Sequence, residues 1–377
     1  MNSDWKTVSL GDLLNFRRGH DLPQTAMKKG NIPVVASNGV IGYHDVATTP
    51  CPCLTIGRSG NVGKPHYLEE KAWAHNTTLY VDDFKDNDPH FLYYLLQTLR
   101  LEHYRGGSAV PTLNRNHIHP IQVRVPKQLQ EQQDIAETLL CLDDKIELNN
   151  RINKNLEAQT QAIFKSWFID YEQFQDGEFV DSELGQIPKG WKVGTLGEIS
   201  DIVMGQSPPG SSYNENGEGM VFYQGRAEFG YRFPNRRLFT TEPKREAQEK
   251  DILLSVRAPV GDFNIATEKC CIGRGLASIT PKPGFYSYCV CLMRHLKPYF
   301  DTYNGEGTVF GSINKASLNN MKVIIPTIDV VKRFDVLICD LDKIILSYFK
   351  QNETLSTLRD TLLPKLMSGE IQIPQEV

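Results

Sequence analysis

Two parts of this chain repeat each other, and the repeat constrains the fold more than any single motif does. A first block, Trp5 to Pro23, recurs 186 positions later as Trp191 to Pro209, with the same tryptophan-lysine, leucine-glycine, glycine and proline spacing. A second block, Gly107 to Pro126, recurs 200 positions later as Gly307 to Pro326. The text between the blocks shares only fragments, so the sequence predicts one scaffold that carries two different faces.

Length and composition agree with a duplicated soluble protein. A chain of 377 residues exceeds the size of a single core, which favours two domains. No apolar run approaches the ~18 residues of a membrane span, and Met1 to Trp5 is too polar to open a signal peptide, so the cytoplasm is the expected compartment. The formal charge of −4 indicates that any contact with nucleic acid depends on local basic patches or on partners.

The cysteines do not predict a metal site. Eight are scattered along the chain without paired CxxC knuckles or a suitably spaced histidine pair. We expect reduced and mostly buried thiols, and no bound metal.

Two long segments have the apolar spacing of helices that pair through a seam. Residues 131–168 step by four and three, which predicts a helix about 57 Å long. A second helix of the same period runs from Phe334 to Pro364. Because such a strip is unstable in water, we expect the two helices to pair with each other, although packing of each helix on its own domain is the alternative. The predicted scaffold residues are Ile135, Leu139, Leu142, Ile146, Leu156, Ile163, Trp167, Phe334, Leu337, Leu341, Ile344, Leu355, Leu358 and Leu362.

Each globular part is predicted to be rich in β-strands, with a helix inserted late. Alternating and β-branched runs predict strands at residues 53–56, 78–81, 121–125, 252–256, 276–279 and 321–325. Pro89 is placed to open a helix over 91–104, and a similar stretch lies at 286–296. The polar stretch 170–190 is typical of a linker. The fold class is therefore α+β: two β-rich globular domains, separated by two long helices packed as an antiparallel coiled coil with an internal pseudo-two-fold repeat.

Three motifs resemble catalytic or cofactor-binding motifs, but the other residues that those functions need are missing or the match is common by chance. Residues 303–307 resemble the loop that holds S-adenosylmethionine, yet the catalytic Asn/Asp-Pro-Pro-aromatic tetrapeptide is missing. Residues 57–64 imitate a phosphate-binding loop, but Arg58 and Pro65 stand where it needs glycine and Ser/Thr. Glu69-Glu70-Lys71 contains a nuclease-like triplet that is common on charged surfaces. We therefore predict no catalytic residues and no cofactor bound by this chain.

Basic residues gather in the parts of the two copies that differ. Arginine can bind guanine through two hydrogen bonds in the major groove, and lysine mainly holds phosphate. For each residue, a solvated surface charge is the alternative. The candidate DNA-binding residues are Arg17, Arg18, Lys28, Lys29, Arg58, Lys64, Arg105, Ser108, Arg115, Arg226, Arg232, Arg236, Arg237, Arg257, Arg274 and Lys315.

The whole chain resembles the specificity subunit of type I restriction-modification systems. Trp5 to Asp12 and Gly185 to Glu198 are similar to the family's two domain entries. Ala162 to Phe168 is similar to the close of its central spacer helix, and Leu362 to Ile371 to the end of its distal one. In this order, and combined with the duplication, these motifs are specific to the family.

The resemblance implies a modular layout and several partners. It implies target recognition domains at 1–128 and 191–326, a central spacer helix at 129–168, a linker at 169–190, and a distal helix and tail at 327–377. Each domain would read one half of an asymmetric bipartite site in double-stranded DNA, and the length of the helices would set the gap between the halves. Two modification subunits with S-adenosylmethionine, and restriction subunits using ATP and magnesium, are the expected partners.

Two other functions stay open from the residues alone. One is a self-contained DNA-binding or nuclease protein, and the other is a non-enzymatic coiled-coil tether. Methyl transfer by the purified chain would favour the first, and failure to co-purify with a methyltransferase partner would favour the second.

Overall fold

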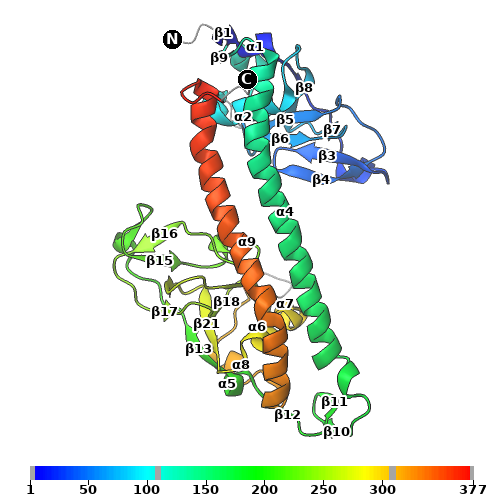
Figure 1. Ribbon diagram of the computed structural model, residues 1–377, viewed down its shortest axis with the longest axis vertical. Coiled ribbons are helices and arrows are strands. Elements are labelled where there is room, and N and C mark those ends of the chain that lie inside the picture. The colour runs from blue at the N-terminus through cyan, green and yellow to red at the C-terminus, as the bar shows by residue number, and fades with distance from the viewer. Residues whose placement is uncertain (1–4, 107–111, 305–310, 374–377) are drawn as a thin grey trace. The chain divides into compact units, whose positions relative to one another are not determined.

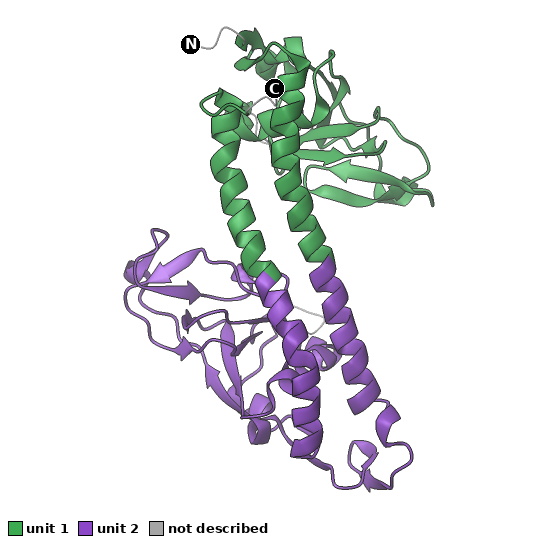
Figure 2. Ribbon diagram, viewed as in Figure 1, with its two compact units in different colours: residues 1–151, 348–377 green, residues 152–347 purple. Residues whose placement is uncertain are grey.

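The computed structural model describes residues 5–106, 112–304 and 311–373, and divides into two compact units. Unit 1 comprises residues 1–151 and 348–377, and unit 2 comprises residues 152–347 (Figure 2). Each unit therefore holds one globular part and a portion of both long helices. The domain boundaries predicted from the sequence treat the helices as separate from the globular domains, and these boundaries stay predictions.

The globular part of unit 1 is built on small sheets that are antiparallel except for one parallel strand pair (Figure 1). β1 (Trp5–Ser9) pairs with β9 (Gln122–Pro126) and so joins the start of the globular part to its end. The strands of the main sheet, in spatial order, are β2 (Asn15–Arg18), β8 (Thr78–Asp83), β5 (Cys53–Gly57) and β6 (Pro65–Leu68). A second sheet has the order β4 (Gly39–His44), β3 (Ile32–Ala36) and β7 (Trp73–Ala74).

Local sequence signals explain where the helices of unit 1 begin. Ser9 and Asp12 form a capping box at the start of α1 (Leu10–Leu13). The Asp88 side chain accepts a hydrogen bond from the Phe91 N–H, and Pro89 occupies the first turn of α2 (Pro89–Thr98). The helix predicted over 91–104 ends earlier, at Thr98, and residues Leu101–Tyr104 form a separate 3-10 turn. The short helix α3 (Arg115–Ile118) precedes β9.

Unit 2 repeats this plan with different strand lengths. β12 (Lys192–Thr195) pairs with β22 (Lys322–Ile325), as β1 pairs with β9. The sheet that corresponds to the main sheet of unit 1 has the order β13 (Ser200–Met204), β21 (Leu276–Pro281), β18 (Ile252–Ser255) and β19 (Phe263–Ile265). The remaining sheet has the order β14 (Tyr213–Asn214), β16 (Leu238–Thr240), β15 (Met220–Tyr223), β20 (Cys270–Ile272) and β17 (Glu246–Ala247). Its helices are α5 (Leu196–Ile199), α6 (Tyr286–His295), α7 (Lys297–Asp301) and α8 (Lys315–Asn319).

The six predicted strands are confirmed, but the predicted linker is not a bare connection. Within residues 170–190, β10 (Phe179–Ser182) and β11 (Gly185–Pro188) form an antiparallel hairpin. The hairpin follows a 3-10 turn, Glu172–Phe174. The Phe174 ring of this turn packs edge-on against Trp191. Aromatic residues within the polar stretch are the signal that this segment folds back.

The two long helices are confirmed as α4 (Leu129–Phe168) and α9 (Ile328–Ser368). α9 continues four residues beyond Pro364, where the sequence suggested an end. In unit 1 the helix portions run antiparallel, because Asp143 pairs with Arg359 while Asn149 bonds Gln351. In unit 2 they are antiparallel again, because Asn153 bonds the Ile345 carbonyl while Phe164 packs on Phe334.

Each unit has its own core, to which both helices contribute. In unit 1, Leu139 of α4 and Leu366 of α9 belong to the same buried cluster as Leu10 and Phe91. In unit 2 an aromatic group joins Phe168 of α4, Tyr288 of α6 and Phe334 of α9. The mixed helix and strand content with two long helices, predicted from the sequence, is thus confirmed. In the described residues, no helix is long and apolar enough to cross a membrane.

Candidate nucleic-acid interface

The loop that joins β5 to β6 in unit 1 is held tightly by its own backbone. The Gly57 N–H donates to the Lys64 carbonyl at 3.0 Å, and the Gly63 N–H donates back to the Gly57 carbonyl at 2.8 Å. Gly63 has a φ of +81°, and a Cβ there would lie 2.9 Å from the Leu101 Cβ, so a side chain would be excluded. Arg58 is fixed on this loop, since its N–H donates to Thr77 at 2.7 Å and its carbonyl accepts from Leu113 at 2.8 Å.

The loop that joins β18 to β19 in unit 2 has the same frame. The Ser255 N–H donates to the Asp262 carbonyl at 2.7 Å, and the Gly261 N–H donates to the Ser255 carbonyl at 3.0 Å. The Val256 carbonyl accepts from Ile313 at 3.1 Å, as the Arg58 carbonyl accepts from Leu113. Arg257 is exposed on this loop, and the Val256 N–H donates to Gly275 at 2.9 Å, which brings the turn that carries Arg274 beside it.

The two loops share a backbone but differ in charge. Lys64 lines a surface hollow of about 490 Å³ together with Asn61, Gln97 and Arg105. In unit 2 the residue after the tight glycine is Asp262, which lines a hollow of about 480 Å³ and is bound by Arg226 and Lys297. The same scaffold position is therefore cationic in one copy and occupied by a neutralised acid in the other.

Half of the predicted DNA-binding residues form neither a salt bridge nor a hydrogen bond through their side chains within the described parts of the chain. Unpaired cations keep their charge and donors available for phosphate or for the edges of bases. These residues are Lys28, Lys29, Arg58, Lys64, Arg105, Arg257, Arg274 and Lys315. Arg58 is half-buried and the other seven are exposed.

The other candidates that the structure describes all have a hydrogen-bond or salt-bridge partner. Arg17 pairs with Asp82, Arg18 with Asp21, Arg236 with Glu268 and Arg237 with Glu228. Exposed pairs of this kind are weak and exchange readily for phosphate, so pairing alone does not remove these arginines from an interface. The Arg115 guanidinium donates to the Phe16 carbonyl at 3.1 Å, and Ser108 lies outside the described residues.

Arg232 is a correction to the sequence prediction. Its side chain is 6% exposed, and its guanidinium contacts Glu157 and Asp342. A buried arginine held by two carboxylates cannot reach a base, so this residue has a structural role. The sequence did not reveal this, because Glu157 and Asp342 lie far from Arg232 along the chain.

Two polar residues of the unit 1 hollow were missed by the sequence prediction. Asn61 and Gln97 line it beside Lys64 and Arg105, and amide side chains are suited to binding adenine. Asn61 stands between two glycines of positive φ, Gly60 and Gly63, which is the signal that could have singled it out.

The predicted scaffold residues are buried or half-buried on α4, whereas three of those on α9 are exposed. On α4, Ile135, Leu139 and Trp167 are buried, and Leu142, Ile146, Leu156 and Ile163 are half-buried. On α9, Phe334 is buried and Leu341, Leu355 and Leu362 are half-buried. Leu337, Ile344 and Leu358, however, are 47%, 42% and 44% exposed.

At Leu337 and Ile344, the buried row of α9 lies one residue further along. Ile338 and Ile345 are 1% exposed. α9 thus has two adjacent apolar rows of the same period, and periodicity alone cannot decide which of them faces α4.

No group of three or more His, Cys, Asp or Glu side chains in the described residues could hold a metal ion. Burial raises the pKa of the Cys53 thiol to about 11 and that of Cys291 to about 12. These two thiols are therefore protonated and unreactive at neutral pH.

Comparison with known proteins defines the class to which this scaffold belongs. The family described as "Type I restriction modification DNA specificity domain" matches residues 2–158 and 188–365. The two matched stretches correspond to the two copies of the repeat. The chain therefore belongs to the type I restriction-modification DNA specificity family, as its sequence motifs indicated.

Individual relatives span most of the chain. The putative type I restriction enzyme MjaX specificity subunit of Methanocaldococcus jannaschii is 35% identical over 82% of this chain and 74% of its own length. The HindI specificity subunit of Haemophilus influenzae is 22% identical over 98% of this chain and 100% of its own. The crystal structure of a type I S subunit from M. genitalium matches with a TM-score of 0.64 at 17% identity, covering 100% of this chain and 98% of that one, which shows a shared fold.

Proposed function

We propose that this chain is the DNA-recognition subunit of a type I restriction-modification complex, in which each copy of the repeat reads one half of a bipartite site. The observation that carries the proposal is the pair of loops after β5 and β18. They have the same hydrogen-bonded frame, yet the first loop offers Arg58 and Lys64, whereas the second offers Arg257 beside the neighbouring turn that carries Arg274. A common scaffold with different side chains is what two unlike half-sites require.

The arrangement of the domains forms part of the proposal. Target recognition domains at 1–128 and 191–326 would be separated by the helices, packed along their length as an antiparallel coiled coil. The antiparallel contacts within each unit support this layout. Helix length would then set the gap between the half-sites, since readers on one face of DNA are spaced by about one helical turn, ~34–36 Å.

Catalysis would come from partner subunits. Two modification subunits carrying S-adenosylmethionine would bind the helices, and restriction subunits using ATP and magnesium would join for cleavage. The exposed row of α9, with Leu337, Ile344 and Leu358, supports a role in subunit contact, because apolar side chains in register on a helix are unusual in water. The chain would act in the cytoplasm, where its target DNA lies, and phosphate contacts by partners would offset its net negative charge.

Adenine methylation across the host genome, mapped with and without the gene, tests this function. We expect a two-part motif to lose methylation in the deletion strain and to regain it when the gene is returned. A chain returned with a foreign segment in place of residues 191–326 should change one half of the motif only. An unchanged methylation pattern in the deletion strain would contradict the proposal.

A further inference from the structure

Two acidic side chains face each other between the helices of unit 2. Glu157 of α4 is 2% exposed and Asp342 of α9 is 13% exposed, and the Arg232 guanidinium contacts both. Its Nη1 lies 3.0 Å from Glu157 Oε1, and its Nη2 lies 2.5 Å from Asp342 Oδ1. Without this arginine, two buried carboxylates on adjacent helices would repel each other.

The arginine does not belong to either helix. Arg232 lies in the globular part of unit 2, between Arg226–Glu228 and β16. The Ile265 N–H donates to its carbonyl at 2.9 Å, which ties its backbone to β19. A second arginine of the globular part, Arg294 on α6, approaches Glu157 to 3.0 Å. The charge that lets the two helices pair here is therefore supplied by the globular part that packs on them.

In unit 1, the charge of the corresponding acid is balanced by a residue of the facing helix. Asp143 of α4 and Arg359 of α9 form a direct salt bridge of 2.5 Å. The Tyr94 hydroxyl of α2 donates to Asp143 at 2.7 Å, so the globular part adds a hydrogen bond but no charge. Asp143 and Asp342 lie at corresponding positions, since α4 begins at Leu129 and α9 at Ile328. The acid therefore pairs with the facing helix in unit 1, whereas in unit 2 it is bound by an arginine of the globular part.

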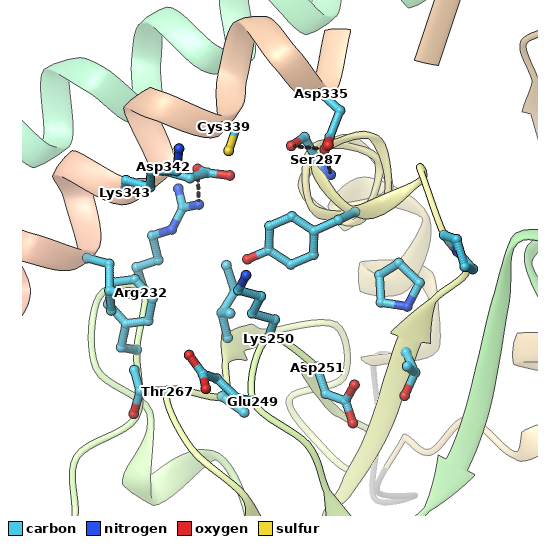
Figure 3. Close-up of a pocket in the computed structure, with 18 of the residues that line it drawn as sticks. Arg232, Glu249, Lys250, Asp251, Thr267, Ser287, Asp335, Cys339, Asp342 and Lys343 are labelled. Atoms are coloured by element: carbon cyan, nitrogen blue, oxygen red, sulfur yellow. Dashed lines mark hydrogen bonds and ion pairs between the residues drawn. The ribbon is translucent and has the colours of Figure 1, made fainter. Parts of the chain in front are cut away.

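The Arg232 contact stands at one end of a cavity, as Figure 3 shows. The cavity of about 390 Å³ lies between α9 and the globular part of unit 2, and Lys250, Cys339 and Lys343 are among the residues that line it. At its other end, Asp335 of α9 accepts hydrogen bonds from Ser287, at 2.6 Å from Oγ and 3.2 Å from N–H. Contacts between α9 and the globular part therefore flank the cavity, at Asp342 on one side and at Asp335 on the other.

The acids respond unequally to their surroundings. Burial would raise the pKa of Glu157, but Arg294 and Arg232 hold that pKa below its ordinary value. Burial raises the pKa of Asp342 above its ordinary value, although Arg232 opposes the shift, and Asp335 and Glu157 add repulsion. Asp342 depends on one arginine, whereas Glu157 has two.

We propose that Arg232 is a positioning residue, which fixes the orientation of the globular part of unit 2 on the helices by bridging Glu157 and Asp342. Its loss leaves the contacts around Asp335 and the aromatic group of Phe334, about which the globular part can tilt. The consequence for DNA rests on the proposed function: half-site bases stay the same, but the gap between half-sites is less strictly selected.

The experiment uses the full chain with Arg232→Met, which keeps an apolar stem and removes the charge. Hydrogen exchange without DNA is the first readout. We expect faster exchange in α6 and β19, while β18 and β21 keep their protection. Faster exchange throughout unit 2, or exchange unchanged from the parent chain, would overturn the proposal.

Two further variants separate positioning from folding. The double variant Arg232→Met, Asp342→Asn removes the carboxylate that is left without a partner and keeps Glu157 for Arg294, so we expect its Tm to recover while exchange in α6 stays fast. Arg232→Lys should restore part of the protection, because lysine keeps the charge but cannot bridge two carboxylates with a planar fork. Arg359→Met is the matched control in unit 1, and it should leave exchange in unit 2 unchanged. Loss of protection in α6 with this control would contradict the proposal.

The second readout is binding by the assembled complex to duplexes that share both half-sites but differ in gap length. We expect preference for the best gap to fall about tenfold in the double variant Arg232→Met, Asp342→Asn and to be retained in Arg359→Met. Unchanged gap preference together with altered exchange would overturn the link to spacing. If the parent complex shows no bipartite preference at all, the proposed function fails, while the exchange result still decides the role of Arg232.

Discussion

Asn149 of α4 donates a hydrogen bond of 2.7 Å to the Gln351 side chain of α9, and a second of 2.8 Å to Asn352. Asn149 is fully buried between the helices of unit 1, and its Oδ1 has no hydrogen-bond partner among the described residues. A polar group in an apolar seam lowers stability but penalises every other register, since a shifted pairing would leave more of its atoms unpaired.

Replacing Asn149 by an apolar residue should therefore show whether the amide contributes to stability or only to the register of the helices. We expect Asn149→Leu to leave the free energy of unfolding unchanged or to raise it by about 1 kcal/mol, because the unpaired Oδ1 is removed. Gln351 and Asn352 can then turn to water, as neither is buried. Urea denaturation measures the change, with Asn150→Leu as the exposed control. A loss of more than about 2 kcal/mol would show that the amide is a net stabiliser.

Stability should decline in mildly acidic solution, partly through His119. Its Nε2 accepts the Phe16 N–H at 3.2 Å, so the neutral ring is required, and burial together with Arg115 and Lys85 lowers the pKa of His119 below 6.5. The unfolded chain binds the proton first, so stability is lost as pH falls through 6.5 toward the folded pKa.

His119→Asn tests this dependence, because the corresponding residue of the second copy is Asn319. We expect a smaller fall in Tm between about pH 7 and pH 5 than in the parent chain. Burial also lowers the pKa of His295, so some dependence should remain. An identical pH profile in the variant would contradict the assignment to His119.

Gly261 should tolerate no side chain. Its φ is +93°, and a Cβ would lie 2.2 Å from the Phe300 Cβ. We expect Gly261→Ala to cost several kcal/mol, on the order of 3. Gly217 is the matched control, since its φ is +84° but nothing lies within 4 Å of an added Cβ, so Gly217→Ala should cost about 1 kcal/mol. Thermal unfolding of both variants distinguishes steric conflict from backbone strain, and equal losses would exclude the conflict with Phe300.

Arg58 and Arg257 should each affect one half-site. We expect Arg58→Ala and Arg257→Ala to weaken binding of the assembled complex by about 1–3 kcal/mol, and each to relax specificity in a different half of the motif. Lys189→Ala is the control, because this exposed lysine follows the hairpin of β10 and β11 and is not among the candidate DNA-binding residues. Competition binding with half-site variants measures the effect. If both changes relax the same half, the assignment of one copy to each half-site is wrong.

The sequence predicted the parts of this molecule that depend on local pattern. The strands at β5 and β18 follow from β-branched runs, and the start of α2 follows from Pro89. The duplication itself predicted that the two copies would share a frame, and the paired strands β1–β9 and β12–β22 confirm it.

Long-range choices could not be predicted in the same way. Leu337 and Ile338 are both apolar, and only contact with α4 decides that Ile338 is buried. Arg232 has the same side chain as Arg257, yet its function depends on acids that are 75 and 110 positions away. Residue type indicates what a side chain can do, whereas its partners in space determine what it does.

The first and last described segments meet in unit 1, where the Trp5 ring lies 3.0 Å from the position of a Cβ on Gly369 and Trp5 shares a buried cluster with Leu366. On the ribosome, this cluster cannot close until residues near 369 have been translated, although its opening strand emerges first. Unit 2 is one continuous stretch, residues 152–347, so all of its residues have been translated before the last part of unit 1. The half of the protein that is made second can therefore finish folding first, and the half that is made first must wait in an incomplete state.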